Sequence, residues 1–328
     1  MMKSKGILVV LGVLACLFGC GGSGNGGITQ QGGAGGPAAG AIWQALTPMP
    51  TARLEFATAS AEGLIYVIGG RDSAVPVTPK PLLATVDVYD RASDTWSSAP
   101  DLPIALAGLM AVGVDDKIYV MGGEQTDAMV SKALFEFDPA TQIWRQLADL
   151  PLASHFSAHA AVAGQIFVAG GANAGFQVAD LYRYDLATDT WTVGAPMGNP
   201  REGARGVNMN GQFLVHGGKT ATHAQDAGYR RVLESYEPIT DIWTSVEPGE
   251  PRGDFGIAAF DGLAFMFGGS NVARTLDWVH AYDPVADTWI TKTALPKELG
   301  FTAAEVSGDE ILVFSAEDTF SYRPANDP

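Results

Sequence analysis

The chain has 328 residues, of which 47% are hydrophobic, and it contains 40 glycines and 19 prolines. This composition is typical of a folded protein with many short strands and turns, and it excludes a disordered chain. The formal net charge of −16 at pH 7 repels phosphate backbones, so we expect no nucleic-acid partner.

An apolar run from Ile7 to Phe18 follows Lys3 and Lys5. Its twelve residues are fewer than the roughly 20 of a membrane span, but they match the core of a signal peptide. The Gly19-Cys20 pair that follows resembles a bacterial lipobox, in which a small residue precedes a cysteine that is acylated. Phe18 departs from the small residue usual at its place, and Ala15-Cys16 is a weaker second candidate. An ordinary secretory signal cut elsewhere is the alternative.

We therefore expect residues 1–20 to form a lipoprotein signal peptide, with Cys20 as the lipidated residue. Residues 21–40 are rich in glycine, lack a hydrophobic period and are expected to form a flexible tether. Twenty such residues span roughly 25 Å, enough to hold a domain clear of a bilayer. The expected location is that of an exported, lipid-anchored protein, in the outer membrane if the host is Gram-negative, facing the periplasm or the cell surface.

From residue 41 onwards, glycine pairs and tryptophans recur at a fixed spacing. Glycine pairs end five apolar runs, at Gly69-Gly70, Gly122-Gly123, Gly170-Gly171, Gly217-Gly218 and Gly268-Gly269. The distance from a tryptophan to the next pair is 26 residues, or 25 in the last case, for Trp43, Trp96, Trp144, Trp191 and Trp243. An aromatic residue stands seven positions before Trp96, Trp144, Trp191, Trp243 and Trp289, at Tyr89, Phe137, Tyr184, Tyr236 and Tyr282. This pattern resembles the kelch repeat over residues 43–322, and the resemblance implies a β-propeller over residues 41–328.

Each period also has the physical character of a propeller blade. Four short apolar runs are separated by turn signals, and such a sheet needs neighbours to bury both of its faces. The first run of each period is rich in small residues, as in A-T-A-S-A, which suits an innermost strand near a crowded axis. We expect the glycine pairs to mark close backbone approach and the tryptophans to pack between blades.

The ends of the repeat predict six blades. The segment I-L-V-F-S-A is a degraded copy of I-Y-V-I-G-G, and Tyr322 after it is a sixth aromatic residue without a following tryptophan. Trp43, in turn, has no repeat before it. We therefore predict an all-β, six-bladed kelch propeller. Its ring would be closed by the N-terminal strand around Trp43, which completes the C-terminal blade at 299–323.

The variable parts of the repeat indicate where a ligand would bind. Almost all of the length variation lies between the glycine pair and the next aromatic residue, in the loop joining the second and third strands, and such loops carry function. The entry to each innermost strand is expected on the same face. We expect these entries to line the mouth of the central channel. The predicted mouth residues are Arg53, Glu55, Arg201, Arg205, Arg252 and Asp254. Arginines beside carboxylates suit an anionic or hydroxyl-rich ligand; in the alternative, each arginine pairs with a neighbouring blade.

Other residue types offer fewer candidates. The histidines have no metal-ligand spacing, so we expect no metal, and only His223, in the long fourth-blade loop, is retained as a possible functional group. Trp278 suits either a sugar-stacking platform or an edge packing role. No cysteine follows Cys20, which excludes the copper radical oxidases built on kelch propellers, since these need a Tyr–Cys crosslink. We expect no cofactor.

We therefore predict a monomeric, non-enzymatic binding module for a protein or glycan at the cell envelope. The alternative is a carbohydrate-active enzyme similar to the periplasmic kelch mutarotases that act on sialic acid. No motif beyond the kelch frame matches, so no catalytic residue is assigned. A structural partner in an envelope assembly is a third possibility. A mouth carboxyl with a raised pKa beside arginines would favour the enzyme, and a flat apolar loop face would favour a protein partner.

Overall fold

The computed structural model describes residues 41–126, 129–173, 175–220 and 228–327. The signal peptide with Cys20, the tether and His223 lie outside these residues. Apart from the short 3-10 turn Pro324–Asn326, the described elements are β-strands. The all-β class is therefore confirmed.

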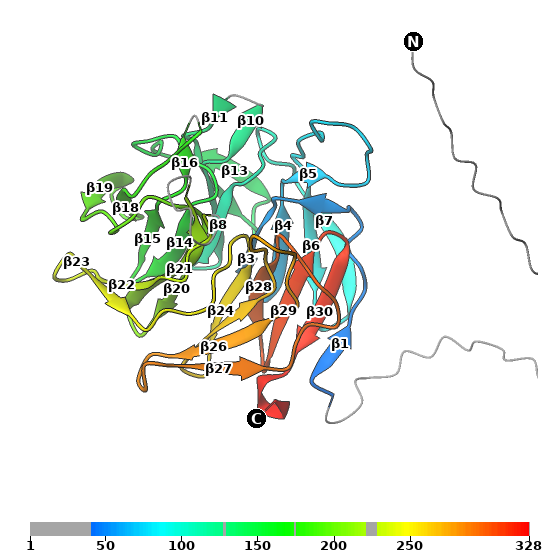
Figure 1. Ribbon diagram of the computed structural model, residues 1–328. Coiled ribbons are helices and arrows are strands. Elements are labelled where there is room, and N and C mark those ends of the chain that lie inside the picture. Colours follow the sequence, from blue (N-terminus) through cyan, green and yellow to red (C-terminus); the bar gives the residue numbers. More distant parts are fainter. Residues whose placement is uncertain (1–40, 127–128, 174, 221–227, 328) are drawn as a thin grey trace, which may run out of the picture. The chain divides into compact units, whose positions relative to one another are not determined.

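Six antiparallel sheets of four strands form the blades (Figure 1). From its inner to its outer strand, blade 1 consists of β3 (Ala57–Ala61), β4 (Leu64–Ile68), β6 (Val86–Asp90) and β7 (Thr95–Ala99). In the same order, blade 2 consists of β8 (Met110–Val114), β9 (Lys117–Met121), β12 (Leu134–Asp138) and β13 (Ile143–Gln146). Blade 3 consists of β14 (Ala158–Val162), β15 (Gln165–Ala169), β18 (Leu181–Asp185) and β19 (Thr190–Gly194).

Blade 4 consists of β20 (Glu202–Met209), β21 (Gln212–Lys219), β22 (Leu233–Glu237) and β23 (Ile242–Val246). Blade 5 consists of β24 (Gly256–Phe260), β25 (Leu263–Phe267), β26 (Val279–Asp283) and β27 (Thr288–Lys292). Blade 6 consists of β28 (Ala303–Ser307), β29 (Glu310–Ser315), β30 (Asp318–Tyr322) and β1 (Trp43–Ala45). Short pairs decorate the loops of blades 1 to 3: β2 (Arg53–Leu54) with β5 (Arg71–Asp72), β10 (Glu124–Thr126) with β11 (Met129–Val130), and β16 (Ala172–Asn173) with β17 (Phe176–Gln177).

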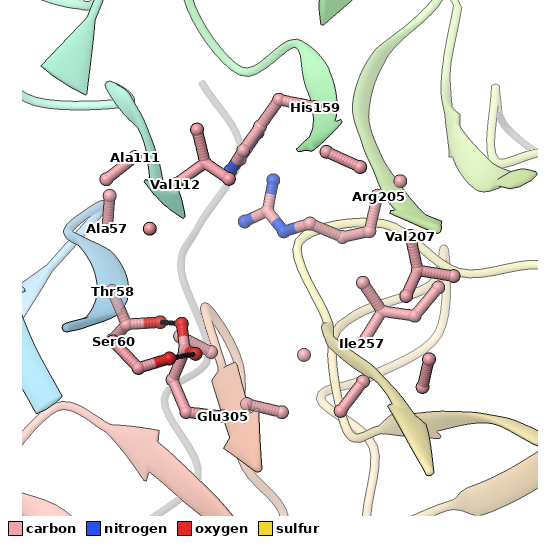
Figure 2. A pocket seen from close by; sticks show the side chains of 18 of the residues that line it. Ala57, Thr58, Ser60, Ala111, Val112, His159, Arg205, Val207, Ile257 and Glu305 are labelled. Atoms are coloured by element: carbon pink, nitrogen blue, oxygen red, sulfur yellow. Dashed lines mark hydrogen bonds between the residues drawn. The ribbon is translucent and has the colours of Figure 1, made fainter. Parts of the chain in front are cut away.

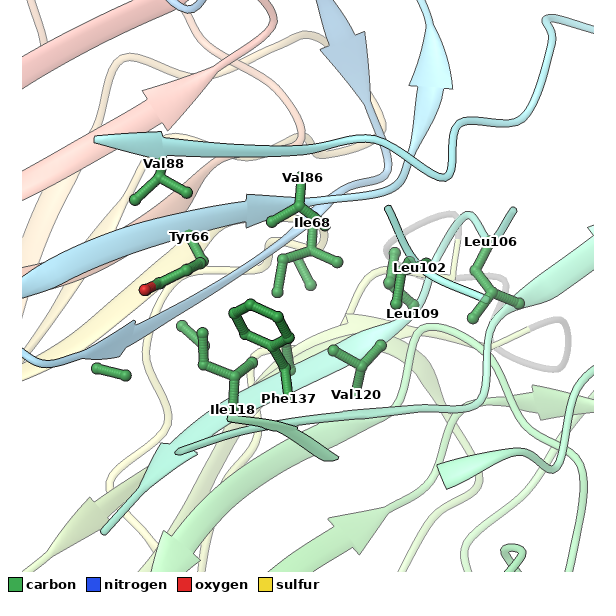
Figure 3. Packing of buried hydrophobic residues seen from close by; sticks show 14 residues of the cluster. Tyr66, Ile68, Val86, Val88, Leu102, Leu106, Leu109, Ile118, Val120 and Phe137 are labelled. Atoms are coloured by element: carbon green, nitrogen blue, oxygen red, sulfur yellow. The ribbon is translucent and has the colours of Figure 1, made fainter. Parts of the chain in front are cut away.

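The core is divided among the junctions between blades. Within the described chain, one cluster of buried apolar side chains lies at each of the six junctions. Figure 3 shows the junction of blades 1 and 2, where Tyr66 and Val86 face Ile118 and Phe137. Each sheet therefore buries both faces only because the ring is complete, as the repeat pattern predicts.

Blade 6 is completed by the N-terminal strand, as predicted. β1 pairs with β30 in antiparallel register, with Trp43 opposite Tyr322, and Figure 1 shows the blue strand beside the red one. The two ring centroids are 4.8 Å apart. Two hydrogen bonds extend the contact. The Leu46 amide donates to the Thr319 carbonyl over 2.9 Å, and the Trp43 indole donates to the Thr293 carbonyl over 3.3 Å.

The glycine pairs lie where backbones of adjacent blades meet. Gly69 has φ of 60°, and a Cβ there would approach the Leu106 carbonyl oxygen to 2.7 Å. The amide of Gly70 donates to the same oxygen over 2.7 Å. Equivalent bonds to the next blade run from Gly123, Gly171, Gly218 and Gly269. The expected close backbone approach is confirmed, and a side chain at Gly69 would force the blades apart.

The tryptophans connect each blade to the one before it. The Trp96 indole donates to the Thr47 carbonyl over 2.9 Å, and the other repeat tryptophans make the same kind of bond. Asp94, two residues earlier, accepts from the Tyr89 hydroxyl over 2.5 Å and from the Thr47 amide over 2.9 Å. The predicted repeat pattern contains the tyrosine and the tryptophan but not this aspartate, which joins them to the preceding blade.

Candidate functional site

Two of the predicted mouth arginines turn into their own blades. Arg53 and Arg201 are 0% exposed. The Arg53 guanidinium is paired with the Asp87 carboxylate and donates to the Gly69 carbonyl over 2.9 Å. Arg201 Nη2 lies 2.6 Å from Glu234 Oε2. These arginines therefore stabilise the place where the second and third strands of one blade diverge, rather than facing a ligand or a neighbouring blade.

The same place in the other blades shows that this role is structural. Arg53 pairs with an acid on the third strand, whereas blade 2 has Leu106 and Phe135 at the two positions. Blade 6 has another leucine and phenylalanine, Leu299 and Phe320, which share one apolar cluster. In blades 1 and 4 the position thus holds an ion pair, and in blades 2 and 6 it holds an apolar pair that fills the same space.

Blade 5 fills this place with Arg252 and His280. The Arg252 guanidinium contacts His280 Nδ1, and Arg252 is 1% exposed. Burial and the nearby Arg252 lower the pKa of His280 to about 4, so the imidazole is neutral at pH 7. The guanidinium carbons of Arg252 and Arg274 lie 5.8 and 5.9 Å from the Trp278 ring. Trp278 therefore has packing partners, which agrees with the edge role rather than an open sugar platform.

The predicted carboxylates Glu55 and Asp254 have partners that the sequence did not indicate. Arg71 bridges Glu55 and Glu124, with N–O distances of 2.9 Å to each. Burial raises the pKa of Glu55, against the opposing effect of Arg71. Asp254 is 3% exposed; its Oδ2 is 3.5 Å from Lys219 Nζ, and its Oδ1 has no hydrogen-bond partner within the described chain.

Backbone hydrogen bonds between adjacent blades fix the segments that lead into the innermost strands. Glu55 has φ of 57° and Asp254 has φ of 56°, and both residues stand just before an innermost strand. The Gly108 amide donates to the Glu55 carbonyl over 2.7 Å, and equivalent bonds continue around the ring through Phe156, Gly203 and Asp254. The left-handed backbone turns each carbonyl toward the next blade, so the mouth has a rigid rim.

Exposed apolar side chains stand at the tips of the loops on the same face. Each lies between the second and third strand of its blade, in blades 1, 2, 3 and 5. They are Val77 (49% exposed), Met129 (57%), Phe176 (76%) and Val272 (63%). We call these four residues the apolar tips. No single repeat motif predicts them, because the loops differ in length and sequence.

The innermost strands enclose a cavity of about 510 Å³ (Figure 2). Arg205, predicted at the mouth, lies on β20 and lines this channel, where its Nε donates to the Phe255 carbonyl over 2.9 Å. His159 lies beside it. Glu305 stands on the other side, and its two oxygens accept from Thr58 Oγ1 and Ser60 Oγ, each over 2.8 Å.

Burial in the channel shifts the pKa of all three ionisable groups. It lowers the pKa of Arg205, although the nearby Asp254 opposes this effect. It lowers the pKa of His159 to about 4, so that this ring is neutral at pH 7. It raises the pKa of Glu305, against the hydrogen bonds from Ser60 and Thr58. Sequence reasoning missed His159 as a site residue and did not consider Glu305.

Neither a metal cluster nor a membrane-spanning helix is found in the part of the chain that the structure describes. No three of its His, Asp or Glu side chains come together in a way that could hold a metal ion. Among the same residues, no helix has the length and apolar character needed to cross a bilayer.

Comparisons with known proteins agree with the architecture. Residues 41–218, more than half of the chain, match the family model "KLHDC2/KLHL20/DRC7 Kelch-repeats domain", and residues 251–296 match the model "Kelch motif". Human Kelch-like protein 25 is 29% identical over 62% of this chain and 34% of its own length. Bovine Kelch-like protein 36 is 23% identical over 80% of this chain and 35% of its own length. The chain thus spans about a third of the length of these relatives.

A solved structure, described as "Structure of YjhT", has the same fold. It superposes with a TM-score of 0.68 at 14% identity and covers 84% of this chain and 95% of its own. At that identity the likeness concerns the fold alone.

Proposed function

Since the chain belongs to the kelch-repeat family of β-propellers, we propose that it is a non-enzymatic binding module whose loop face holds a protein partner at the cell envelope. Kelch domains generally mediate protein interactions. The apolar tips are the observation that carries the proposal. Exposed Met and Phe side chains on one face are typical of protein-binding surfaces, because burying them on association removes apolar area from water.

The mouth beneath the apolar tips is rigid, and this rigidity favours binding of a protein partner. Its rim is held by backbone hydrogen bonds between blades, and Glu55 and Glu124 are fixed by Arg71. A rigid surface loses little conformational entropy on binding. Loops that vary in length on a constant frame supply the specificity.

Envelope attachment through Cys20 is part of the same proposal. The lipid would anchor the chain, and the tether of residues 21–40 would hold the propeller roughly 25 Å from the bilayer. A single anchored copy with a free loop face fits a monomer. Binding of a glycan and an activity similar to that of the sialic acid mutarotases stay predictions. Such an enzyme would depend on Glu55, whose pKa is raised and which lies beside Arg71.

The apolar tips can be tested with matched substitutions. Phe176→Ser and Met129→Ser together should abolish capture of a specific envelope protein that the wild-type propeller retains in cross-linking mass spectrometry. The control is Ile239→Ser with Val285→Ser, because these side chains are 94% and 89% exposed but lie on the turns between the third and outer strands. Retention of the partner by the tip variant, or its loss in the control, would refute binding through the loop face.

A further inference from the structure

Two charged side chains in the channel, Arg205 and Glu305, depart from the repeat. Sheet register identifies the equivalent residue in each blade by its distance from the glycine pair. At the position of Arg205 the other blades have Ala57, Met110, Ala158, Gly256 and Ala303. At the position of Glu305 they have Ala59, Val112, Ala160, Val207 and Ala258. Five blades fold with a small or apolar residue at each position, so the fold does not require these charges.

Arg205 has donors free for a ligand. Figure 2 shows its guanidinium pointing into the cavity, beside His159. Only its Nε makes a hydrogen bond, and within the described residues neither Nη1 nor Nη2 has a partner. A guanidinium held by one nitrogen and open at the other two is arranged to bind a carboxylate through two parallel hydrogen bonds.

Glu305 supplies the opposite charge on the other side of the cavity. Thr58 and Ser60 fix its carboxylate from the neighbouring blade, and each oxygen keeps a lone pair for another donor. A carboxylate buried in the channel needs a cationic or strongly donating partner to offset the loss of water. An ammonium group meets this need.

The cavity has the size and the access for a small molecule. Its volume of about 510 Å³ lies within the usual range of ligand sites. Ser60, Asn208 and Val306 line its end and are exposed, at the end of the innermost strands remote from the mouth residues. A ligand therefore has access from the face opposite the loop face.

We propose that the channel binds a small zwitterion, with its carboxylate on Arg205 and its ammonium group on Glu305. The two protein charges are opposite and lie across the cavity from each other, so a ligand with a single charge would leave one of them unpaired. This site is separate from the loop face and does not depend on the protein partner proposed above.

The probes are linear ω-amino acids from glycine to 6-aminohexanoate, measured by isothermal titration calorimetry. Since the two charges are held at a fixed separation, one chain length should bind best. Hexanoate and hexylamine, which each carry a single charge, should bind at least tenfold more weakly than the best member. Binding by no member at millimolar concentration, or equal binding by hexanoate, would overturn the proposal.

Substitutions by the residues of other blades provide the second test. Arg205→Ala and Glu305→Ala place alanine where three other blades already have it, and each should weaken the best probe at least tenfold. Arg145→Ala is the control, because that side chain is 63% exposed on the outer strand β13. If either alanine variant fails to fold by circular dichroism, Arg205→Met or Glu305→Val replaces it, following Met110 and Val112. Unchanged affinity in the folded Arg205 or Glu305 variants would overturn the proposal.

Discussion

Arg53 and Asp87 occupy in blade 1 the place that Leu106 and Phe135 occupy in blade 2. The Arg53 guanidinium also donates to backbone carbonyls of Gly69 and Thr85, so it satisfies acceptors that water does not reach. A buried ion pair contributes little net stability relative to an apolar pair of similar size, because both charges lose their hydration. Removing only one member is costly, because the other charge stays buried and unpaired.

Arg53→Leu should therefore destabilise the propeller by about 3–5 kcal/mol. The double variant Arg53→Leu with Asp87→Phe should recover most of that loss, because it installs the pair found in blade 2. Urea unfolding followed by tryptophan fluorescence measures both. Equal destabilisation in the single and double variants would show that the backbone hydrogen bonds of Arg53, and not its charge, hold this place.

Glu310 gives the fold a pH dependence. It is 3% exposed, accepts from Arg91 Nε over 2.8 Å and pairs with Arg323. Burial alone would raise its pKa, but the hydrogen bonds from Arg91 and Arg323 hold it below the usual value. Because the pKa in the folded state is lowered, the ionised carboxylate stabilises the folded state above the unfolded pKa of about 4.3. That stability is lost as the pH falls through the lower, folded pKa.

Glu310→Gln should accordingly lower the free energy of unfolding at pH 7 by about 1–3 kcal/mol. The difference from the wild type should shrink below pH 4, where the wild-type carboxylate is also neutral. Chemical denaturation at a series of pH values gives the comparison. A difference that stays constant down to pH 2 would assign the effect to packing and not to charge.

At the scale of elements, β1 decides whether the ring is closed. It supplies the outer strand of blade 6, and Trp43 packs against Tyr322 and against Phe267 of blade 5, with ring centroids 4.8 and 6.0 Å apart. Without β1 the outer edge of β30 would be unpaired, and unpaired edges promote association between molecules. Blade 6 is thus the place where the two ends of the described propeller depend on each other.

Trp43→Ala should lower the melting temperature, with a loss below the roughly 3–5 kcal/mol of a fully buried tryptophan, because Trp43 is only partly buried. Deletion of residues 41–50 should give aggregated or proteolysed protein. Differential scanning fluorimetry and limited proteolysis measure the two effects. The control is Ile239→Ala, since that side chain is 94% exposed. A Trp43 variant that melts like the wild type would contradict the contribution of β1 to ring stability.

At the scale of the whole molecule, the propeller offers two separate surfaces. The loop face has the apolar tips and the rigid mouth, and the channel opens to the other face. In the proposed membrane-anchored form, a lipid on Cys20 would hold the chain and residues 21–40 would form the tether. Such a chain would bind a protein partner beside a membrane, while the channel would take a small zwitterion without competing for the same surface.

Cys20→Ser should release the protein from the membrane fraction of its native host without changing the melting of the propeller. The propeller has its core at the junctions between its own blades, within residues 41–327. Fractionation shows the release, and mass spectrometry of the wild type should find diacylglycerol on Cys20. A soluble mature chain that begins at another residue would contradict the lipobox prediction.

The sequence by itself determined the strand pattern, the six blades and the closure through Trp43, because one local pattern is repeated along the chain. Glycine pairs, aromatic residues and tryptophans report short-range geometry, and six copies make their spacing unambiguous. The departures at Arg205 and Glu305 were also present in the sequence, and aligning the innermost strands across blades would have found them.

Only the tertiary structure decided where the side chains point and which of them meet. Spacing placed Arg53 and Arg201 near an innermost strand, but their guanidinium groups turn into their own blades, because carbonyls and a third-strand carboxylate lie there. Arg205 and Glu305 come from blades 4 and 6, and they share a cavity only because the ring closes around one axis. Such convergence depends on contacts between distant segments, which a local repeat does not encode.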